Sequence, residues 1–502
     1  MGPLLTIGLI VALVLQAQVV IGATPTPTII LDNGAFTGVA TTPDTQSFLG
    51  IPSAQPPCAL FFSFHSHIRL INYRRVAMGP ACPQQTAVVP ILTGLTLNII
   101  KPANATADSK LPVVLWLFAG GFEFGTPARY NGVPIVQRSI AMDQPIIYVS
   151  INYRVSAFGF LGGKQVRKAG VGNLGLHDQR EALRWVQNWG ESAGAISVSL
   201  QMLANGGDTE GLFRAGYMQS GSPVPVGPFE NGQKYYDDLV AQTGCSGAAD
   251  TLACLRTVPY GKLKAAQDAS PFFLSYQSLV LAWLPREDGI FLTDQPQRLV
   301  QQGKVANVPF IVGNCDDEGT LFSLSTLNIT VWAPSAGQDT VAALATAYPS
   351  ELAQGSPFGT GILQALTPQF KRLAAFQGDA VFHAPRRFFQ QARSGKQDQW
   401  AYLNKRYKSV PFLGSFHTTD VFNVYQQGEL TDYLINFVTT LDPNGPTVPS
   451  WPKYTTESPN LMTFEDGLLQ VGATKGKTEV TQDTFRVEAM KVLTDVSLEF
   501  PI

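Results

Sequence analysis

Short apolar segments that recur along the chain constrain its fold more than any other feature. Residues 111–118 (LPVVLWLF) and 145–153 (PIIYVSINY) are rich in β-branched and aromatic residues and are bounded by turn residues. Segments of this length and composition are typical of strands that are buried on both faces of a sheet. Residues 307–314 (NVPFIVGN) and 399–406 (QWAYLNKR) predict two further strands.

Helical segments alternate with these strands. Residues 178–187 (DQREALRWVQ) place apolar and charged side chains on different faces of a helix, and residues 195–203 (AISVSLQML) predict a second helix. This alternation predicts an α/β fold with a mostly parallel central sheet flanked by helices. Because neither an internal repeat nor a low-complexity linker interrupts the chain, we expect a single domain over residues 24–502.

The N-terminus is typical of a secretory signal. Apolar residues run from Leu4 to Ala23, and the polar sequence TPTPT follows. The segment lacks Lys and Arg, but small residues precede the polar change. We therefore predict a cleaved signal peptide at residues 1–23, with a membrane anchor as the weaker alternative. Sequons at Asn104 and Asn328 agree with glycosylation of a secreted, extracellular protein.

Charge and cysteine content narrow the classes of partner and compartment. The formal net charge is −2 and no long basic run is present, so electrostatics gives no reason to expect nucleic acid as a partner. Cys245 and Cys254 close a short loop and are the best candidates for a disulfide in an oxidising compartment. The five cysteines cannot all pair within one chain.

The sequence G-E-S-A-G places Ser192 at the centre of a G-x-S-x-G motif, which is typical of a nucleophile on a sharp strand-to-helix turn. A serine nucleophile needs a base, a third group that orients the base, and N–H donors for the developing oxyanion. The glycine pair Gly120 and Gly121, which follows a predicted strand, and Ala193 are candidates for these donors. The motif alone is weak evidence, because a long chain can contain it by chance.

His417 is the best candidate for the base. It lies in a loop rich in Gly, Ser and Thr after a predicted strand, which is where such a base belongs in an α/β sheet. His177 and His383 lie in predicted helices, and we interpret them as structural. His65 and His67 form an H-x-H pair without nearby Cys or acidic residues, so we expect neither a metal site nor another cofactor.

Glu318 is the best candidate for the third group. It follows a predicted strand and falls between Ser192 and His417, in the order nucleophile, acid, base that α/β-hydrolases use. The alternative is that these are loop carboxylates beside a surface histidine. Other carboxylates remain possible. Asp316 and Asp317 are rivals by position, and Asp288 and Asp420 are weaker candidates.

Six ordered motifs together resemble the type-B carboxylesterase/lipase family of cholinesterase-like α/β-hydrolases, most closely its secreted fungal lipase branch. They are GGFEFG, NYRVSAFGFL, GNLGLHDQREALRWVQ, WGESAGAISV, GNCDDEGT and LGSFHTTD, within a resemblance that runs from about residue 28 to the C-terminus. The resemblance implies a serine esterase or lipase with Ser192 as nucleophile, His417 as base and Glu318 as acid. It further implies an oxyanion hole at Gly120, Gly121 and Ala193, a disulfide between Cys245 and Cys254, and a salt bridge between Arg154 and Asp178.

The chain departs from the family in three places. The family has a glycine-rich loop and a strand before the nucleophile, about 10–15 residues that are missing between Gln187-Asn188 and Trp189-Gly190. In the flap region, Cys82 is present but Gly94 occupies the position of its partner, and residues 58–77 do not match. We therefore expect a locally incomplete fold. We hypothesise a gene-model or splicing fault, which sequencing of the transcript would test.

These features predict a secreted carboxylic-ester hydrolase that acts through an acyl-enzyme on small-molecule or lipid esters, with transient contact to a lipid interface. Residues 271–285 (PFFLSYQSLVLAWLP) are a plausible apolar acyl pocket, although an aromatic stripe is more often core. A non-catalytic hydrolase-fold protein is the alternative, favoured by the missing strand. A serine peptidase on the same fold is a weaker third option.

Overall fold

The computed structural model describes most of the chain. The described residues are 27–31, 34–52, 73–74, 78, 82–85, 95–184, 187–324, 336–467 and 476–502. Several sequence-based expectations lie outside them: the signal peptide at 1–23, the histidine pair His65 and His67, the sequon at Asn328, and most of the segments 58–77 and 86–94. Within the described part of the chain, no helix is long and apolar enough to cross a membrane.

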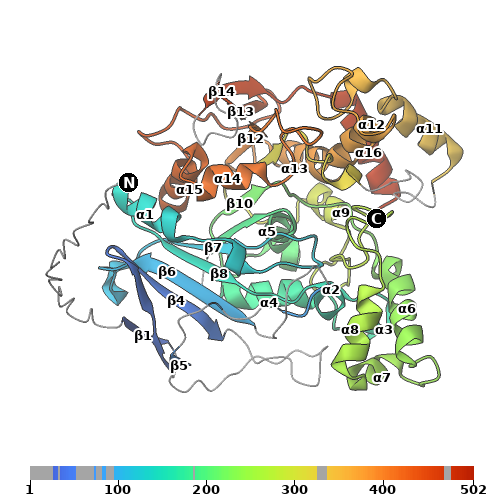
Figure 1. The fold of residues 1–502 in the computed structure, drawn as a ribbon, viewed down its shortest axis with the longest axis horizontal. Helices are drawn as coiled ribbons and strands as arrows, with labels where there is room; N and C mark the ends of the chain where they lie inside the picture. The colour runs from blue at the N-terminus through green and yellow to red at the C-terminus, as the bar shows by residue number, and fades with distance from the viewer. Residues whose placement is uncertain are drawn as a thin grey trace, which may run out of the picture.

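The molecule is built on one large twisted sheet (Figure 1). Its eleven strands lie in the order β14-β13-β12-β11-β10-β9-β7-β8-β6-β4-β3. Neighbours from β13 to β8 are parallel, whereas the strands at both ends are antiparallel. The strands are β3 (Val39–Thr42), β4 (Thr45–Pro52), β6 (Thr96–Pro102), β7 (Val113–Leu117), β8 (Ile147–Ile151), β9 (Gln187–Glu191), β10 (Gly216–Gln219), β11 (Phe310–Cys315), β12 (Gln399–Lys405), β13 (Asn460–Glu465) and β14 (Lys477–Gln482).

The four apolar segments form strands as the sequence predicts, namely β7, β8, β11 and β12. All six residues of β11 are buried, because helices cover both faces of the sheet. A separate small sheet joins β1 (Thr28–Leu31), β2 (Gly34–Thr37) and β5 (Tyr73–Arg74). The expected α/β-hydrolase fold with a mostly parallel centre is therefore present.

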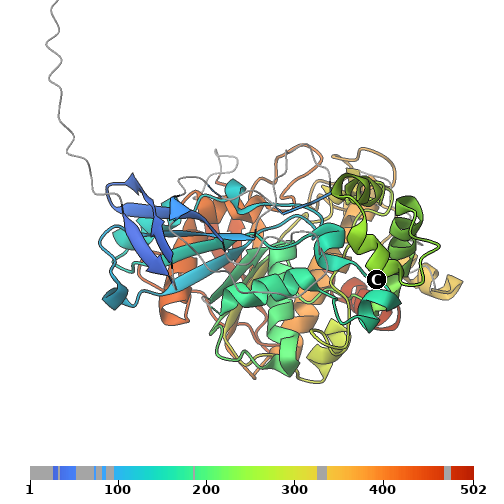
Figure 2. The same cartoon turned by 90° about the horizontal axis from the view of Figure 1, so that it is seen from below.

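Helices cover the two faces of the sheet (Figures 1 and 2). Helix α5 packs on β7, β9 and β10, whereas α1 packs on β4, β6 and β8 together with α14 and α15. The helices are α1 (Val133–Ala141), α2 (Ser156–Phe160), α3 (Lys164–Lys168), α4 (Leu174–Leu183), α5 (Ala193–Leu203), α6 (Gln233–Thr243), α7 (Thr251–Thr257), α8 (Tyr260–Asp268), α9 (Pro296–Gln301), α11 (Gln338–Ala347), α12 (Phe370–Gly378), α13 (Ala384–Arg393), α14 (Thr419–Tyr425), α15 (Glu429–Thr440) and α16 (Val487–Glu499). A π-helical segment, η7 (Asp379–His383), joins α12 to α13.

The strand that seemed to be missing before Ser192 is present, so the expectation of a locally incomplete sheet is wrong at this point. Helix α4 ends at Leu183 instead of reaching residue 187, and β9 begins at Gln187. β9 pairs in parallel with β7 on one side and with β10 on the other. Pairing on both sides satisfies the backbone of β9, and this tertiary gain outweighs the low strand propensity of the sequence QNWGE. What is short in this chain is the connection between helix and strand.

Trp189 contributes the main apolar contact of β9. Its side chain is fully buried, and its ring lies 4.3 Å from the ring of Trp116 on β7 and stacks 5.5 Å from that of Tyr425 on α14. The indole N–H also donates to the side chain of Gln219 on β10 at 2.8 Å. A large aromatic side chain with both its ring and its polar atom satisfied anchors the short strand in the sheet.

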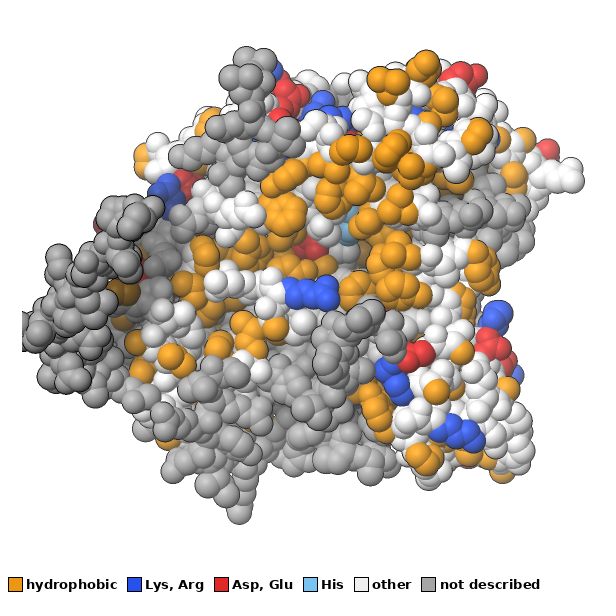
Figure 3. All heavy atoms as spheres, viewed as in Figure 1, with side chains coloured by type: hydrophobic (Ala, Val, Ile, Leu, Met, Phe, Trp, Pro, Cys, Tyr) orange, Lys and Arg blue, Asp and Glu red, His pale blue; other side chains and the backbone are white. Residues whose placement is uncertain are grey.

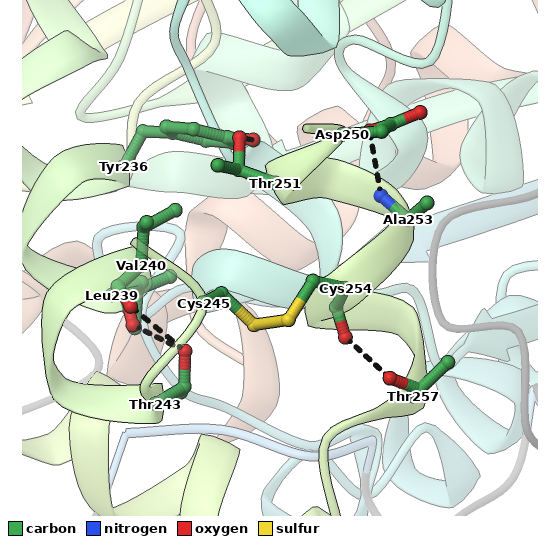
Figure 4. The surroundings of a disulfide bond; sticks show 10 residues. All are labelled: Tyr236, Leu239, Val240, Thr243, Cys245, Asp250, Thr251, Ala253, Cys254 and Thr257. Atoms are coloured by element: carbon green, nitrogen blue, oxygen red, sulfur yellow. Dashed lines mark hydrogen bonds between the residues drawn. A yellow bond between two sulfur atoms is a disulfide. The ribbon is translucent and has the colours of Figure 1, made fainter. Parts of the chain in front are cut away.

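Two further expected pairs form as the family resemblance implies. Cys245, after α6, and Cys254, in α7, form a disulfide that joins these helices (Figure 4). Arg154 and Asp178 are both nearly buried and form a bidentate ion pair, with the shortest contact at 2.7 Å. This pair ties the segment after β8 to α4.

Candidate active site

Ser192 lies at the sharp turn from β9 to α5 and has the strained backbone angles φ 53° and ψ −122°. The glycines on either side of it are required by close packing. A Cβ on Gly190 would lie 2.5 Å from the backbone of Gly194, and a Cβ on Gly194 would lie 2.0 Å from the carbonyl oxygen of Leu117. Such contacts are too short for any side chain, so the strand and helix can meet at this angle only with glycine at both positions. The turn exposes the Ser192 hydroxyl to the cavity described below.

The structure brings Ser192, His417 and Glu318 together. His417 Nε2 lies 2.8 Å from Ser192 Oγ, and His417 Nδ1 lies 2.5 Å from Glu318 Oε2. The other carboxylate oxygen of Glu318 accepts a hydrogen bond from the backbone N–H of Cys315 at 2.7 Å. A carboxylate at Nδ1 fixes the proton there, which leaves Nε2 free to accept from the serine hydroxyl.

The rival acids have other partners. Asp316 and Asp317 each form an ion pair with Lys408, and Asp317 also accepts several hydrogen bonds from loop residues. Asp288 accepts the backbone N–H groups of residues 290–292, and Asp420 accepts from the hydroxyl of Tyr402. Of the carboxylates that the sequence left open, Glu318 is the one hydrogen-bonded to His417.

Two of the other histidines pack against aromatic rings. The ring of His177 packs edge-on against Phe291, and that of His383 packs edge-on against Phe485. Burial lowers the pKa of both, most strongly for His383, which three arginines also surround. Neutral, packed imidazoles agree with the structural interpretation of these residues.

The surroundings of His417 favour its charged form. Burial alone lowers the pKa of this imidazole, but the charge and hydrogen bond of Glu318, together with nearby Glu191 and Asp420, raise it above its usual value. The rings of Phe322 and Phe382 lie 5.1 and 4.6 Å from the imidazole ring. The imidazole is thus held between two aromatic rings and a carboxylate, which restricts its rotation.

Glu191 is a site residue that the sequence reasoning did not single out. It ends β9, its side chain is fully buried, and neither carboxylate oxygen has a hydrogen-bond partner among the residues that the structure describes. Oε1 lies 3.5 Å from His417 Nε2. Burial raises the pKa of Glu191 to about 8, while the charge of His417 opposes this shift. In the sequence, the signal that could have revealed it was a charged residue directly before the serine of the G-x-S-x-G motif.

A cavity of about 690 Å³ opens above Ser192 and His417. Gly120, Gly121 and Ala193, the residues predicted to form an oxyanion hole, line this cavity together with Ser192. Most of its wall is apolar, and hydrophobic side chains gather across the middle of this face in Figure 3. The predicted acyl-pocket segment contributes several lining residues: Phe273, Leu279, Leu281 and Leu284.

Comparisons with known proteins identify relatives of this chain. The model of the carboxylesterase family matches residues 25–482. Lipase 4 of Diutina rugosa is 39% identical over 92% of this chain and 94% of its own length, and the secreted triacylglycerol lipase LIP1 of Gibberella zeae is 37% identical over 93% and 90%. The crystal structure of Aspergillus niger EstA superposes with a TM-score of 0.80 at 24% identity, covering 95% of this chain and 99% of that one.

Proposed function

Since the chain belongs to the carboxylesterase family and is a serine ester hydrolase, we propose that it hydrolyses carboxylic esters through the Ser192–His417–Glu318 triad and an acyl-enzyme. The observation that carries this proposal is the position of His417, within hydrogen-bond distance of both Ser192 Oγ and Glu318 Oε2. Three side chains of the types that nucleophilic catalysis needs are thus aligned in the required order.

The first half-reaction forms the acyl-enzyme. Ser192 Oγ attacks the ester carbonyl carbon while His417 Nε2 takes the hydroxyl proton, and Glu318 stabilises the resulting imidazolium. The negative charge on the carbonyl oxygen is stabilised by the N–H groups of Gly120, Gly121 and Ala193. Ala193 is the first residue of α5, so the positive end of the helix dipole adds to this stabilisation.

The first tetrahedral intermediate collapses as its ester C–O bond breaks and the imidazolium of His417 gives its proton to the departing alcohol, which completes the acyl-enzyme. The second half-reaction releases the acid, and it begins when a water molecule takes the place of the alcohol. His417 Nε2 removes a proton from this water as its oxygen attacks the acyl carbonyl. Collapse of the second tetrahedral intermediate returns the proton to Ser192 Oγ and frees the carboxylic acid.

We further propose lipid esters as substrates and an extracellular location. The apolar wall of the cavity suits an acyl chain, and one of the relatives reported above is named a secreted triacylglycerol lipase. The apolar N-terminal segment supports export.

The non-catalytic alternative relied on the absence of the strand before Ser192. With β9 in place and Ser192 Oγ 2.8 Å from His417 Nε2, no observation favours that alternative.

The test is hydrolysis of dissolved nitrophenyl butyrate by the purified protein. Ser192→Ala should lower kcat by at least about 10⁴-fold, because the nucleophile is lost. The matched control is Ser199→Ala, which removes a buried hydroxyl in α5 that donates to the carbonyl of Ile196 and should keep its activity. Unchanged activity in Ser192→Ala would refute the assignment.

A further inference from the structure

An uncharged surface loop lies between α11 and α12. The sequence contains no Asp, Glu, Lys or Arg between Glu351 and Lys371, and much of the segment 358–369 is exposed. Exposed loops ordinarily carry charged side chains, because their surface faces water. A long exposed segment without any charged side chain is therefore a candidate binding surface.

The loop presents aliphatic side chains to solvent. Ile362 is 72% exposed and Leu363 70%, the highest values among the large hydrophobic residues that the structure describes, and Leu366 is 46% exposed. Phe412, which is 40% exposed, lies in the neighbouring loop, and its backbone N–H donates to the side chain of Gln364 at 2.6 Å. We call these four side chains, Ile362, Leu363, Leu366 and Phe412, the apolar ridge.

The ridge is held in place by buried polar groups. Lys371 is fully buried and turns inward, where its ammonium group donates to Thr360 Oγ1 and to the carbonyl oxygens of Gly361 and Leu363 at 2.6–3.1 Å. Asp317 accepts from the Ser356 hydroxyl and from the N–H of residue 358. These bonds fix the loop backbone with the aliphatic side chains facing solvent. Little conformational entropy is therefore lost when these side chains contact a partner.

The ridge is connected to the mouth of the cavity. Phe422 lines the cavity and is 38% exposed, and its ring lies 5.5 Å from that of Tyr407. Tyr407 begins a turn that includes Phe412. The carbonyl of Tyr407 accepts from the N–H of Val410, and the carbonyl of Val410 accepts from the N–H of Gly414. The rings of Phe422 and the partly exposed Tyr407 thus connect the cavity mouth to the turn that carries Phe412.

We propose that the apolar ridge docks the protein on an uncharged lipid surface, with the cavity mouth beside it. This inference rests on the proposed function, and it identifies the surface through which the protein contacts a phase of lipid ester. Rigid aliphatic side chains beside an active site can enter the acyl boundary of such a surface, where burial of apolar area drives binding.

The lack of charge in the ridge loop indicates which kind of partner it can bind. The ridge loop itself contains no cation that could attract anionic lipid. The cations that adjoin it are paired within the protein: Lys371 and Arg372 donate to backbone carbonyl oxygens, and Arg486 and Lys408 form ion pairs with buried aspartates. A docking site for anionic membranes or for a charged protein partner would need ionic groups at the contact. A neutral lipid phase is therefore the partner that the ridge matches, and self-association through the ridge is the competing outcome.

The test compares the double variant I362S/L363S with the wild type. We expect at least tenfold weaker binding to triolein emulsions and to phosphatidylcholine vesicles, and a matching loss of emulsion hydrolysis, because two aliphatic side chains no longer insert. Wild-type binding should be insensitive to salt and to added anionic lipid. Hydrolysis of dissolved nitrophenyl butyrate should stay unchanged, which separates docking from catalysis and shows that the variant is folded.

The matched control is the double variant I290S/V480S, which removes two exposed aliphatic side chains away from the ridge loop. It should bind lipid as the wild type does. Equal lipid binding by I362S/L363S and the wild type would overturn the inference. Wild-type protein that hydrolyses dissolved ester but does not bind lipid would also overturn it. Dimerisation of the wild type that I362S/L363S abolishes, without lipid binding, would assign the ridge to self-association. Failure to hydrolyse dissolved ester would instead contradict the proposed function.

Discussion

At the scale of the single residue, His417 has the most constrained environment in the site. A carboxylate, two aromatic rings and the serine hydroxyl surround its imidazole, and each fixes either its orientation or its protonation. Burial lowers the pKa of His417, and Glu318 is the main group that raises it. Changes at Glu318 should therefore alter both the rate and its dependence on pH.

Glu318→Gln should reduce kcat by about 10²–10⁴-fold, because the amide no longer stabilises the imidazolium. It should also lower the pKa of His417. Since His417 acts as a base only when neutral, the acidic limb of kcat/KM should move to lower pH. The measurement is a pH profile of nitrophenyl butyrate hydrolysis, with Glu351→Gln, an exposed carboxylate, as the control. An acidic limb that stays in place would contradict the role given to Glu318.

Glu191 makes a prediction about stability. Its folded-state pKa of about 8 lies above the usual value of 4.5, so the wild type loses stability as pH rises from near 4.5 through 8, where the buried carboxyl must ionise. Glu191→Gln removes this loss. Relative to the wild type, the variant should gain a few kcal/mol between those limits, at about 1.4 kcal/mol for each pKa unit. Thermal unfolding across this pH range is the measurement, and parallel curves for the two proteins would refute it.

At the scale of the element, β9 shows what sequence could and could not predict. The apolar strands β7, β8, β11 and β12 were predictable, because β-branched and aromatic runs between turns have few other solutions in an α/β fold. β9 was not, since QNWGE is polar and continues a helical pattern. Its conformation is decided by hydrogen bonds to β7 and β10, which are remote in sequence.

The site shows the same limit. The motif and the chain order pointed to Ser192, His417 and Glu318, but the sequence left Asp316 and Asp317 as rivals of Glu318 by position. The turn decides between them, because it directs Asp316 and Asp317 to Lys408 and Glu318 to His417. Glu191 was missed because its burial is apparent only once β9 is recognised as a strand.

The contact between β9 and α5 gives a prediction at this scale. Gly190→Ala places a methyl group against the backbone of Gly194, so strand and helix must move apart. We expect a loss of about 1–3 kcal/mol in the free energy of unfolding, together with reduced activity because Ser192 moves. The control is Gly247→Ala, whose added Cβ meets no atom within 4 Å. Both are measured by urea unfolding, and equal stabilities would contradict the steric argument.

At the scale of the whole molecule, the chain is expected to be exported. The protein secreted by a fungal host should begin after Ala23, which N-terminal sequencing would show. Asn104 lies exposed in the turn after β6, so it should carry a glycan, and Asn104→Gln should lower the mass by that glycan. Material that keeps its apolar N-terminus would indicate the membrane anchor instead.

The order of the triad along the chain has a consequence for biosynthesis. Ser192 and His417 are 225 residues apart, and Glu318 precedes His417 by 99 residues. A ribosome must therefore translate beyond His417 before the nucleophile can meet its base. A nascent chain that ends before His417 therefore lacks the base of the proposed triad and should not hydrolyse esters.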